Sequence, residues 1–397
     1  MNFEDIFSPT AQKYIQENNT TPIEKLLLGA KKYPELNIPL LVAQIEGRGK
    51  AQKKLPSWFA IKEVVYPIKL SMEQCSSEQT AVYKASIVSG KSLIDLTGGF
   101  GVDCSAFAEK LEQVYYVEQN TELASIAERN FKLFKKDNIE VVNQDSEIYI
   151  TAFDLTVDWI FIDPARRKEG GKVFRFADCE PNILALKNTL FAKAKKILIK
   201  TSPLLDIDLA IQELGNVAEV HVLSIENECK ELLFLLDPAL KKSNAEIVAV
   251  NIRKDGREDL FSFTRKKEDE AIVTISLPLQ FLYEPNVSIL KAGAFKSIAI
   301  KTGLSKLNVS SHLYTSELCQ EDFPGRIFKI IKTVKYSKKE LLAEIPEGKA
   351  NITVRNFPDS VEVIRKKTGL KDGGSTYLFA TKDKDDKLIV LLTEKIN

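Results

Sequence analysis

Seven short β-rich apolar runs lie between residues 76 and 237, and their spacing constrains the fold more than any other feature. Helical stretches separate the first five runs, a pattern typical of a parallel sheet wrapped by helices. Only residues 226–230 separate the last two runs, which is too short for a parallel crossover. We therefore expect an α/β domain whose sheet ends in an antiparallel hairpin. The runs are 92–96, 113–118, 140–143, 159–162, 196–200, 220–225 and 231–236.

The two flanks of this α/β region have different patterns. Before residue 73, apolar residues recur at helical spacing, interrupted at Pro34 and Pro39, which predicts a helical N-terminal domain. After residue 240, we expect strands at 245–252, 271–277, 326–331, 350–354, 376–381 and 387–393 and helices at 337–343 and 359–368. The predicted domain boundaries are 1–72, 73–240, 241–320 and 321–397.

Composition excludes several classes of protein. The 397 residues are 28% charged with a net charge of +1, so any nucleic-acid-binding surface must be local. The first ten residues are acidic where a secretory signal is basic, and no run approaches the roughly 18 apolar residues of a membrane span. We expect a cytoplasmic protein with no membrane partner. Five cysteines without metal-ligand spacing and two histidines predict no metal site and no Ser-His-Asp catalysis.

A glycine-rich turn follows the first apolar run. The run ends in Asp95, and glycines in the turn allow a ligand to approach the backbone at the start of a helix. The dinucleotide fingerprint G-x-G-x-x-G needs a third glycine where this chain has Cys104, which disfavours a nicotinamide cofactor. The carboxylate of Asp95 suits the ammonium group of a ligand. A tight connection between a strand and a helix, with no ligand, also explains a single glycine-rich turn. The candidate cofactor-binding residues here are Asp95, Thr97, Gly98, Gly99 and Gly101.

Acidic residues also follow the second and third runs. Glu118 stands twenty-three residues after Asp95, where its carboxylate could accept hydrogen bonds from both hydroxyls of a ribose, with Gln119 beside it. Asp145 follows the third run, where it could accept a hydrogen bond from an adenine amino group. Either side chain alone could be a solvated surface carboxylate. Acids at three consecutive strand ends favour a nucleoside-containing cofactor.

The fourth run closes on Asp163 and Pro164, which places Asp163 at the edge of the sheet where open α/β sheets carry out chemistry. We expect Asp163 to orient or deprotonate a substrate, with Arg166 as a second catalytic candidate. Arg166 and Arg167 could hold a phosphate or carboxylate by forked hydrogen bonds, although a solvated Arg167 is equally consistent. The substrate-binding candidates are Pro164, Arg166, Arg167 and Lys200.

Segments 73–81, 95–103, 162–167 and 282–286 together resemble a bacterial family of class I S-adenosylmethionine-dependent methyltransferases with a C-terminal THUMP-like domain. The resemblance implies a Rossmann-like catalytic domain, S-adenosylmethionine as methyl donor, a ferredoxin-like segment at 241–320 and a THUMP-like domain at 321–397. It implies that Gln74, Ser76 and Ser77 line the cofactor pocket. It also implies an RNA partner, either tRNA or rRNA.

Local charge agrees with an RNA partner. Residues 285–397 contain 20 Lys and Arg against 13 Asp and Glu, an excess of +7 in a chain of net charge +1. A methyltransferase acting on a protein or small molecule, a non-catalytic RNA-binding protein and an NAD-dependent oxidoreductase are the alternatives. The candidate phosphate contacts are Lys291, Lys296, Lys301, Lys306, Lys338, Lys339, Arg365, Lys366 and Lys367.

Overall fold

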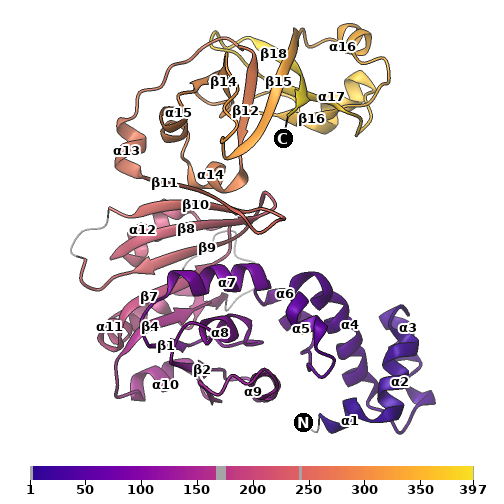
Figure 1. The fold of residues 1–397 in the computed structure, drawn as a ribbon, viewed down its shortest axis with the longest axis vertical. Coiled ribbons are helices and arrows are strands. Elements are labelled where there is room, and N and C mark those ends of the chain that lie inside the picture. Colours follow the sequence, from indigo (N-terminus) through magenta and orange to yellow (C-terminus); the bar gives the residue numbers. More distant parts are fainter. Residues whose placement is uncertain (1–2, 167–175, 241–243, 397) are drawn as a thin grey trace. The chain divides into compact units, whose positions relative to one another are not determined.

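The computed structural model describes residues 3–166, 176–240 and 244–396 (Figure 1). The chain forms two compact units. The first unit contains residues 1–217 and 234–242, and the second contains residues 218–233 and 243–397. In the described part of the chain, every helix is too short or too polar to cross a bilayer.

Helices form the N-terminal part of the first unit. Ser8 and Asn37 cap two of them, and a proline follows each cap at a position where a helix needs no backbone N–H. Their apolar core, which includes Trp58, also contains Phe100 from the α/β part, so the two parts share one core. The elements are α1 (Glu4–Phe7), α2 (Pro9–Asn18), α3 (Ile23–Leu28), η1 (Ala30–Lys32), α4 (Ile38–Lys54), α5 (Pro56–Ala60) and α6 (Lys69–Gln74).

A parallel sheet forms the centre of the first unit. Its strands β1 (Ser92–Asp95), β2 (Gln113–Val117), β3 (Ile139–Val142), β4 (Val157–Ile162) and β7 (Ala194–Thr201) are all parallel, as predicted. Helices alternate with them along the chain. They are α7 (Glu78–Ile87), α8 (Val102–Phe107), α9 (Thr121–Leu133), α10 (Ser146–Ala152), α11 (Ile183–Lys193) and α12 (Ile207–Leu214). Short elements β5 (Ala165–Arg166), η2 (Phe176–Asp178) and β6 (Cys179–Glu180) follow β4.

The predicted hairpin is formed by β8 (Val217–Ile225) and β9 (Glu228–Leu236). Its two-residue turn, Glu226 and Asn227, has positive φ at both positions, the conformation that matches the twist of a hairpin. The strand order is β11-β10-β8-β9-β7-β4-β1-β2-β3, so the last strand of the hairpin lies between its partner and β7. The sequence did not predict that β10 (Glu246–Ile252) and β11 (Glu258–Thr264) extend this sheet beyond β8.

A seven-stranded sheet, in the order β13-β14-β12-β15-β18-β17-β16, organises the rest of the second unit. The strands are β12 (Phe281–Pro285), β13 (Ser305–Lys306), β14 (Tyr314–Ser316), β15 (Gly325–Val334), β16 (Asn351–Val354), β17 (Thr376–Lys382) and β18 (Leu388–Lys395). The helices are α13 (Arg265–Glu270), α14 (Val287–Ala292), α15 (Ser297–Thr302), α16 (Lys338–Glu344) and α17 (Val361–Thr368).

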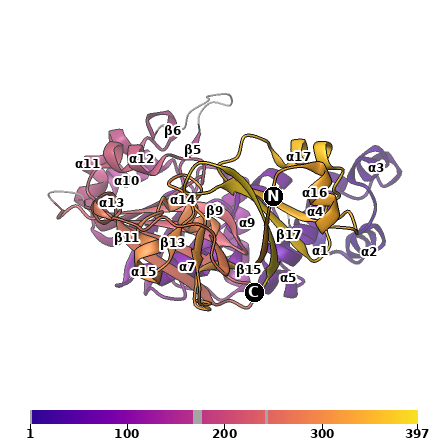
Figure 2. The same cartoon turned by 90° about the horizontal axis from the view of Figure 1, so that it is seen from above.

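One prediction for this unit is wrong, and two sets of contacts hold the unit together. The expected strand at 271–277 is wrong, because this segment makes only an isolated bridge between Ile275 and Lys306. Helices α16 and α17 pack against each other, and Figure 2 shows them side by side. Buried Glu284 on β12 pairs with Arg326 on β15 and with Arg355, at 2.9 Å in the latter case. These ion pairs join residues that lie far apart in the sequence of the unit.

Candidate active site

The three glycines of the turn after β1 have different structural roles. A Cβ atom at Gly98 would lie 2.3 Å from the Tyr116 ring, and one at Gly101 would lie 2.5 Å from the Phe131 ring. Both positions therefore require glycine for internal packing. Gly99 has a φ of +54°, and a Cβ atom there would approach nothing closer than the Thr97 carbonyl at 3.7 Å. Open space beside Gly99 is what a ligand lying on this turn needs.

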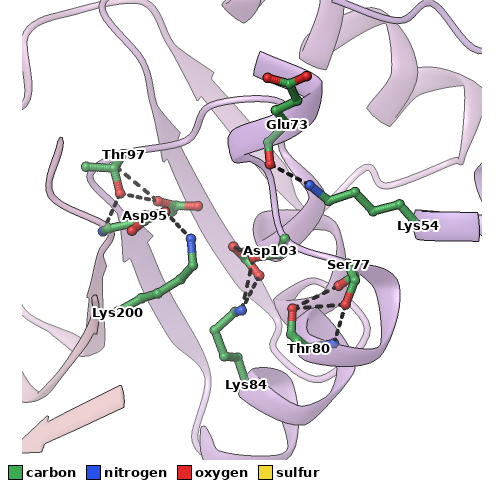
Figure 3. A network of polar contacts seen from close by, with 11 residues as sticks. Lys54, Glu73, Ser77, Thr80, Lys84, Asp95, Thr97, Asp103 and Lys200 are labelled. Carbon is green, nitrogen blue, oxygen red and sulfur yellow. Dashed lines mark hydrogen bonds and ion pairs between the residues drawn. The ribbon is translucent and has the colours of Figure 1, made fainter. Parts of the chain in front are cut away.

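The ends of β1 and β4 are tied together through Thr97. Buried Asp95, which is 1% exposed, accepts a hydrogen bond at 3.0 Å from the Thr97 backbone N–H. The Thr97 hydroxyl oxygen accepts a hydrogen bond at 2.7 Å from the Asp163 backbone N–H. Figure 3 shows Asp95 and Thr97 beside Lys200. The structure thus brings together Asp95 and Lys200, two predicted residues that are 105 positions apart in the sequence.

Asp163 forms an ion pair with Lys200 at the end of β7. The Lys200 side chain is 11% exposed and the Asp163 side chain 34%, so the carboxylate is the more accessible partner. A charge pair that is shielded from water on one side is stronger than one at the surface. The pair holds the Asp163 carboxylate in place while leaving part of it accessible to a substrate.

Glu118 anchors the glycine turn from the end of β2. One carboxylate oxygen accepts a hydrogen bond from the Gly99 N–H at 2.9 Å, and the other accepts one from the Asn120 N–H at 2.8 Å. The Tyr116 hydroxyl donates to the Gly99 carbonyl at 2.6 Å. A carboxylate offers about four acceptor positions, so Glu118 keeps capacity for a ligand after these two bonds.

The electrostatic environment of Asp95 is unusual. Burial raises the pKa of Asp95 well above the ordinary carboxyl range, and the negative charge of Asp103 raises it further. The charges of Asp163 and Glu118 act in the same direction, while the hydrogen bond from Thr97 opposes them. Asp103 and Asp163 have ammonium partners in Lys84 and Lys200, so Asp95 is the acid of this group whose ionised form a bound cation would stabilise.

A buried polar network connects α7 to the helix that follows the glycine turn (Figure 3). Lys84 is completely buried and forms an ion pair with Asp103 at 3.1 Å. The Lys84 ammonium donates to the Ser76 hydroxyl at 3.0 Å, and that hydroxyl donates to Asp103 at 2.7 Å. The network fixes the segment before α7 against the first turn of α8.

The N-terminal helices contribute a cation to the same region. Lys54, at the end of α4, donates to the backbone carbonyls of Met72 at 2.9 Å and Glu73 at 2.8 Å (Figure 3). Burial lowers the pKa of Lys54; Cys75 opposes this shift, whereas the charge of Lys200 adds to it. The helical N-terminal part therefore supports the segment around Cys75 that leads into α7.

Comparison with known proteins decides the family. A ferredoxin-like domain model matches residues 281–324, and a THUMP domain-like model matches residues 325–395. A candidate methyltransferase from Porphyromonas gingivalis, known from its crystal structure, is 32% identical and superposes with a TM-score of 0.86, covering 97% of this chain and 97% of its own. The chain belongs to this methyltransferase family.

Two relatives identify the methyl donor. They come from two strains of Mycobacterium tuberculosis, and each is named an uncharacterised S-adenosylmethionine-dependent methyltransferase. Each is 20% identical over 312 residues, which cover 76% of this chain and 80% of the relative. The predicted enzyme class, cofactor and fold are therefore confirmed. The boundary between the two matched C-terminal segments falls between β12 and β15, within one sheet of the methyltransferase.

Other predicted residues of the methyltransferase lie outside this network. Asp145 caps α10, accepting hydrogen bonds from the N–H groups of Glu147 and Ile148 at 2.9 and 3.0 Å. Gln74 and Gln119 are exposed, Pro164 is buried, and Ser77 caps α7. The structure describes only the backbone of Arg166, in β5, and Arg167 lies outside the described residues. The described residues contain no cluster suited to hold a metal ion.

Sequence analysis did not identify the roles of Lys54, Lys84 and Asp103. Asp103 stands inside the glycine motif, but its partner Lys84 lies nineteen positions earlier in the sequence. The helix that contains Lys84 has no sequence pattern that indicates burial. Lys54 ends a helix in what reads as a separate domain. No local signal marked Lys84, because α7 has no apolar stripe that would place this lysine in the interior.

Substitutions at Gly98 and Gly99 should have opposite consequences. Gly98→Ala forces a methyl group into Tyr116 and should lower the free energy of unfolding by roughly 1–3 kcal/mol. Gly99→Ala meets open space and should cost only about 1 kcal/mol from its positive φ. It should nevertheless weaken S-adenosylmethionine binding at least about tenfold. Urea unfolding and calorimetry measure the two effects, and equal cofactor affinities of Gly99→Ala and wild type would contradict the assignment.

Binding of S-adenosylmethionine should release a proton from Asp95. Because the pKa of Asp95 is raised, the free protein keeps this proton at pH values above the ordinary carboxyl range. Ionisation of Asp95 therefore lowers the stability of the folded protein as the pH rises through the raised pKa. A cationic ligand favours the ionised form, so affinity should increase with pH over the same interval. Calorimetry in two buffers of different ionisation enthalpy counts the released protons. Equal proton release by Asp95→Asn would contradict the prediction.

Proposed function

We propose that the methyltransferase binds S-adenosylmethionine along the carboxyl ends of β1, β2 and β3 and transfers the methyl group directly to RNA. The open space at Gly99 and the buried acid cluster around Asp95 support this position for the cofactor. Asp95 would face the ammonium group, and Glu118 would accept from the ribose hydroxyls. The remaining contacts would come from Gln74, Ser76, Ser77, Thr97, Gly98, Gly101, Gln119, Asp145 and Asp163.

The cofactor supplies an activated methyl group, so the protein needs to align the substrate and exclude water. The partly accessible carboxylate of Asp163 would accept a hydrogen bond from the attacking group of the substrate, or take its proton. The Lys200 ammonium keeps that carboxylate in position. Arg166 and Arg167 would bind a phosphate of the substrate. One observation supports this role of Asp163: its ion pair with Lys200 lies beside the turn that follows Asp95.

Charge in the THUMP-like segment supports RNA as the substrate class. Lys338 and Lys339 on α16 and Lys366 on α17 are exposed, and no described acidic side chain forms an ion pair with them. Helices α16 and α17 pack together, so these lysines lie on neighbouring elements of the same segment. Two other candidates differ. Lys367 pairs with Asp359 at 2.6 Å, and Lys306 is only 3% exposed, so Lys306 is not the surface contact that the sequence suggested.

Transfer of labelled methyl groups to RNA tests the proposal. Total RNA from cells lacking this protein is incubated with labelled S-adenosylmethionine and wild-type enzyme or a Lys338→Glu, Lys339→Glu, Lys366→Glu variant. We expect wild type to label RNA and the variant to show at least about tenfold lower kcat/KM at low salt, because phosphate contacts dominate RNA affinity.

A control variant tests whether the loss of activity comes from these lysines or from any change of surface charge. Lys13→Glu changes an exposed lysine on α2 and should retain the activity of wild type. Labelling of protein or small molecules in a cell extract, with no labelling of RNA, would refute RNA as the substrate and support the alternative acceptors.

A further inference from the structure

The helical N-terminal part packs directly on the glycine turn of the proposed cofactor site. Phe100 stands within this turn, and the centroid of its ring lies 4.9 Å from that of the Trp58 ring. Both side chains are buried in the core that the two parts share. The Ser57 N–H also donates to the Glu78 carboxylate at the start of α7, at 2.9 Å. These contacts fix the C-terminal end of α4, which immediately precedes them in the chain, relative to the turn.

Lys54, the last residue of α4, is half-buried at this place. Two of its three ammonium donors bond to the carbonyls of Met72 and Glu73 at the end of α6 (Figure 3). The remaining donor is within hydrogen-bonding reach of the Cys75 thiol, which is a weak acceptor. An oxygen atom of a ligand would be a much better partner for this donor.

The charge of Lys54 is not balanced by the residues around it. In the described part of the chain, no carboxylate forms an ion pair with Lys54, and the acid beside it, Glu73, pairs with Lys50 at 2.7 Å. Burial raises the pKa of the Cys75 thiol, although Lys54 opposes this shift, so the thiol stays protonated and uncharged at neutral pH. A half-buried ammonium without a counter-charge is costly unless a ligand supplies one.

Two other ammonium groups lie in this region, and both have acidic partners. Lys84 pairs with Asp103 at 3.1 Å, and Lys200 pairs with Asp163. Each of these lysines neutralises a carboxylate of the protein. Lys54 is thus the ammonium of this group that is left to neutralise a carboxylate of a ligand.

Lys54 lies close to the catalytic candidates. Burial lowers the pKa of Lys54, and the positive charge of Lys200 lowers it further, while Cys75 opposes the shift. The charges of Asp103 and Lys200 also act on Cys75, the neighbour of Lys54. An anion bound here would stabilise the Lys54 ammonium and offset its repulsion with Lys200.

The cofactor of this methyltransferase carries such an anion. In S-adenosylmethionine one carbon atom bears both the ammonium group and the carboxylate, so a site that holds the ammonium at Asp95 must accommodate the carboxylate close by. We propose that Lys54 binds this carboxylate; the contact rests on the proposed position of the cofactor at the carboxyl ends of β1, β2 and β3. The helical N-terminal part thereby completes the cofactor site.

Calorimetry with three ligands tests the contact on the full-length protein. Decarboxylated S-adenosylmethionine keeps the ammonium and the sulfonium of the cofactor but lacks the carboxylate, and methylthioadenosine lacks all three charges. We expect wild type to bind S-adenosylmethionine at least about tenfold more tightly than the decarboxylated form, because hydrogen bonds between charged groups are strong. Lys54→Met should lose most of this preference, and its affinity for the other two ligands should fall by no more than about threefold.

Two further variants separate the contact from structural damage. Lys53→Met removes an exposed lysine from the same turn of α4 and should keep the wild-type preference within about twofold. Lys54→Arg retains a positive charge and should keep more of the preference than Lys54→Met does. Equal weakening of all three ligands by Lys54→Met would limit Lys54 to a structural role and overturn the proposal. Equal affinities of wild type for S-adenosylmethionine and its decarboxylated form would overturn it without any variant.

Asp95→Asn separates this contact from the proposed position of the cofactor. It should weaken S-adenosylmethionine and its decarboxylated form, which share the ammonium, and leave methylthioadenosine within about threefold of wild type. Unchanged affinities in Asp95→Asn would refute the proposed position of the ammonium, whereas an unchanged preference in Lys54→Met would refute the Lys54 contact alone. Weaker RNA binding by Lys54→Met, with an unchanged preference, would assign Lys54 to RNA instead. Because these measurements use the cofactor without a substrate, failure of RNA labelling affects neither result.

Discussion

Asp163→Ala should lower the rate of methyl transfer by at least about a hundredfold, a loss typical of removing a group that handles a proton or orients a reacting atom. The affinity for S-adenosylmethionine should stay within about tenfold of wild type, because the hydrogen bond of Asp163 to Thr97 uses the backbone N–H and survives the substitution. Single-turnover transfer of labelled methyl groups measures the first quantity, and calorimetry measures the second.

Two companion variants define what Asp163 contributes. Asp163→Asn keeps the shape but cannot accept a proton, so recovery of the wild-type rate would limit the role to orientation by hydrogen bonding. Lys200→Met removes the partner ammonium and should lower the rate less than Asp163→Ala does, because the carboxylate remains. A rate of Asp163→Ala within threefold of wild type, on RNA or on any acceptor in a cell extract, would remove Asp163 from the mechanism.

Lys84→Met should destabilise the first unit by about 3–5 kcal/mol, the usual cost of leaving one member of a buried ion pair unpaired. Asp103 and Ser76 would lose the ammonium that bonds to both of them. Urea unfolding followed by tryptophan fluorescence measures this effect, because Trp58 and Trp159 are the two tryptophans of the chain and both lie in the first unit.

Controls separate the buried pair from surface charge. Lys91→Met removes an exposed lysine paired with Glu112 and should change the free energy of unfolding by less than about 1 kcal/mol. The double variant Lys84→Met, Asp103→Leu replaces both charges and should recover at least about half of the loss. Equal effects of Lys84→Met and Lys91→Met would show that the network contributes little.

Local sequence patterns predicted the catalytic core because its elements depend on neighbouring residues. Apolar runs closing on Asp95, Glu118 and Asp163 placed these acids at the ends of the first, second and fourth parallel strands, and the short spacing before the last run predicted the hairpin. Strand ends of a parallel sheet meet at one edge, so proximity of the acids followed from topology alone. The roles of these residues in binding the cofactor and in catalysis stay predictions.

Tertiary structure decided the features that depend on residues far apart in the chain. Lys84 with Asp103, Lys54 with the carbonyls before α7, and the stacked rings of Phe295 and His312 carry no local pattern, because a partner's identity and burial are set only when separate elements pack. The strand order that extends the sheet by β10 and β11 is of the same kind. The sequence by itself determined which acids follow the strands; packing alone determined which buried charges found partners.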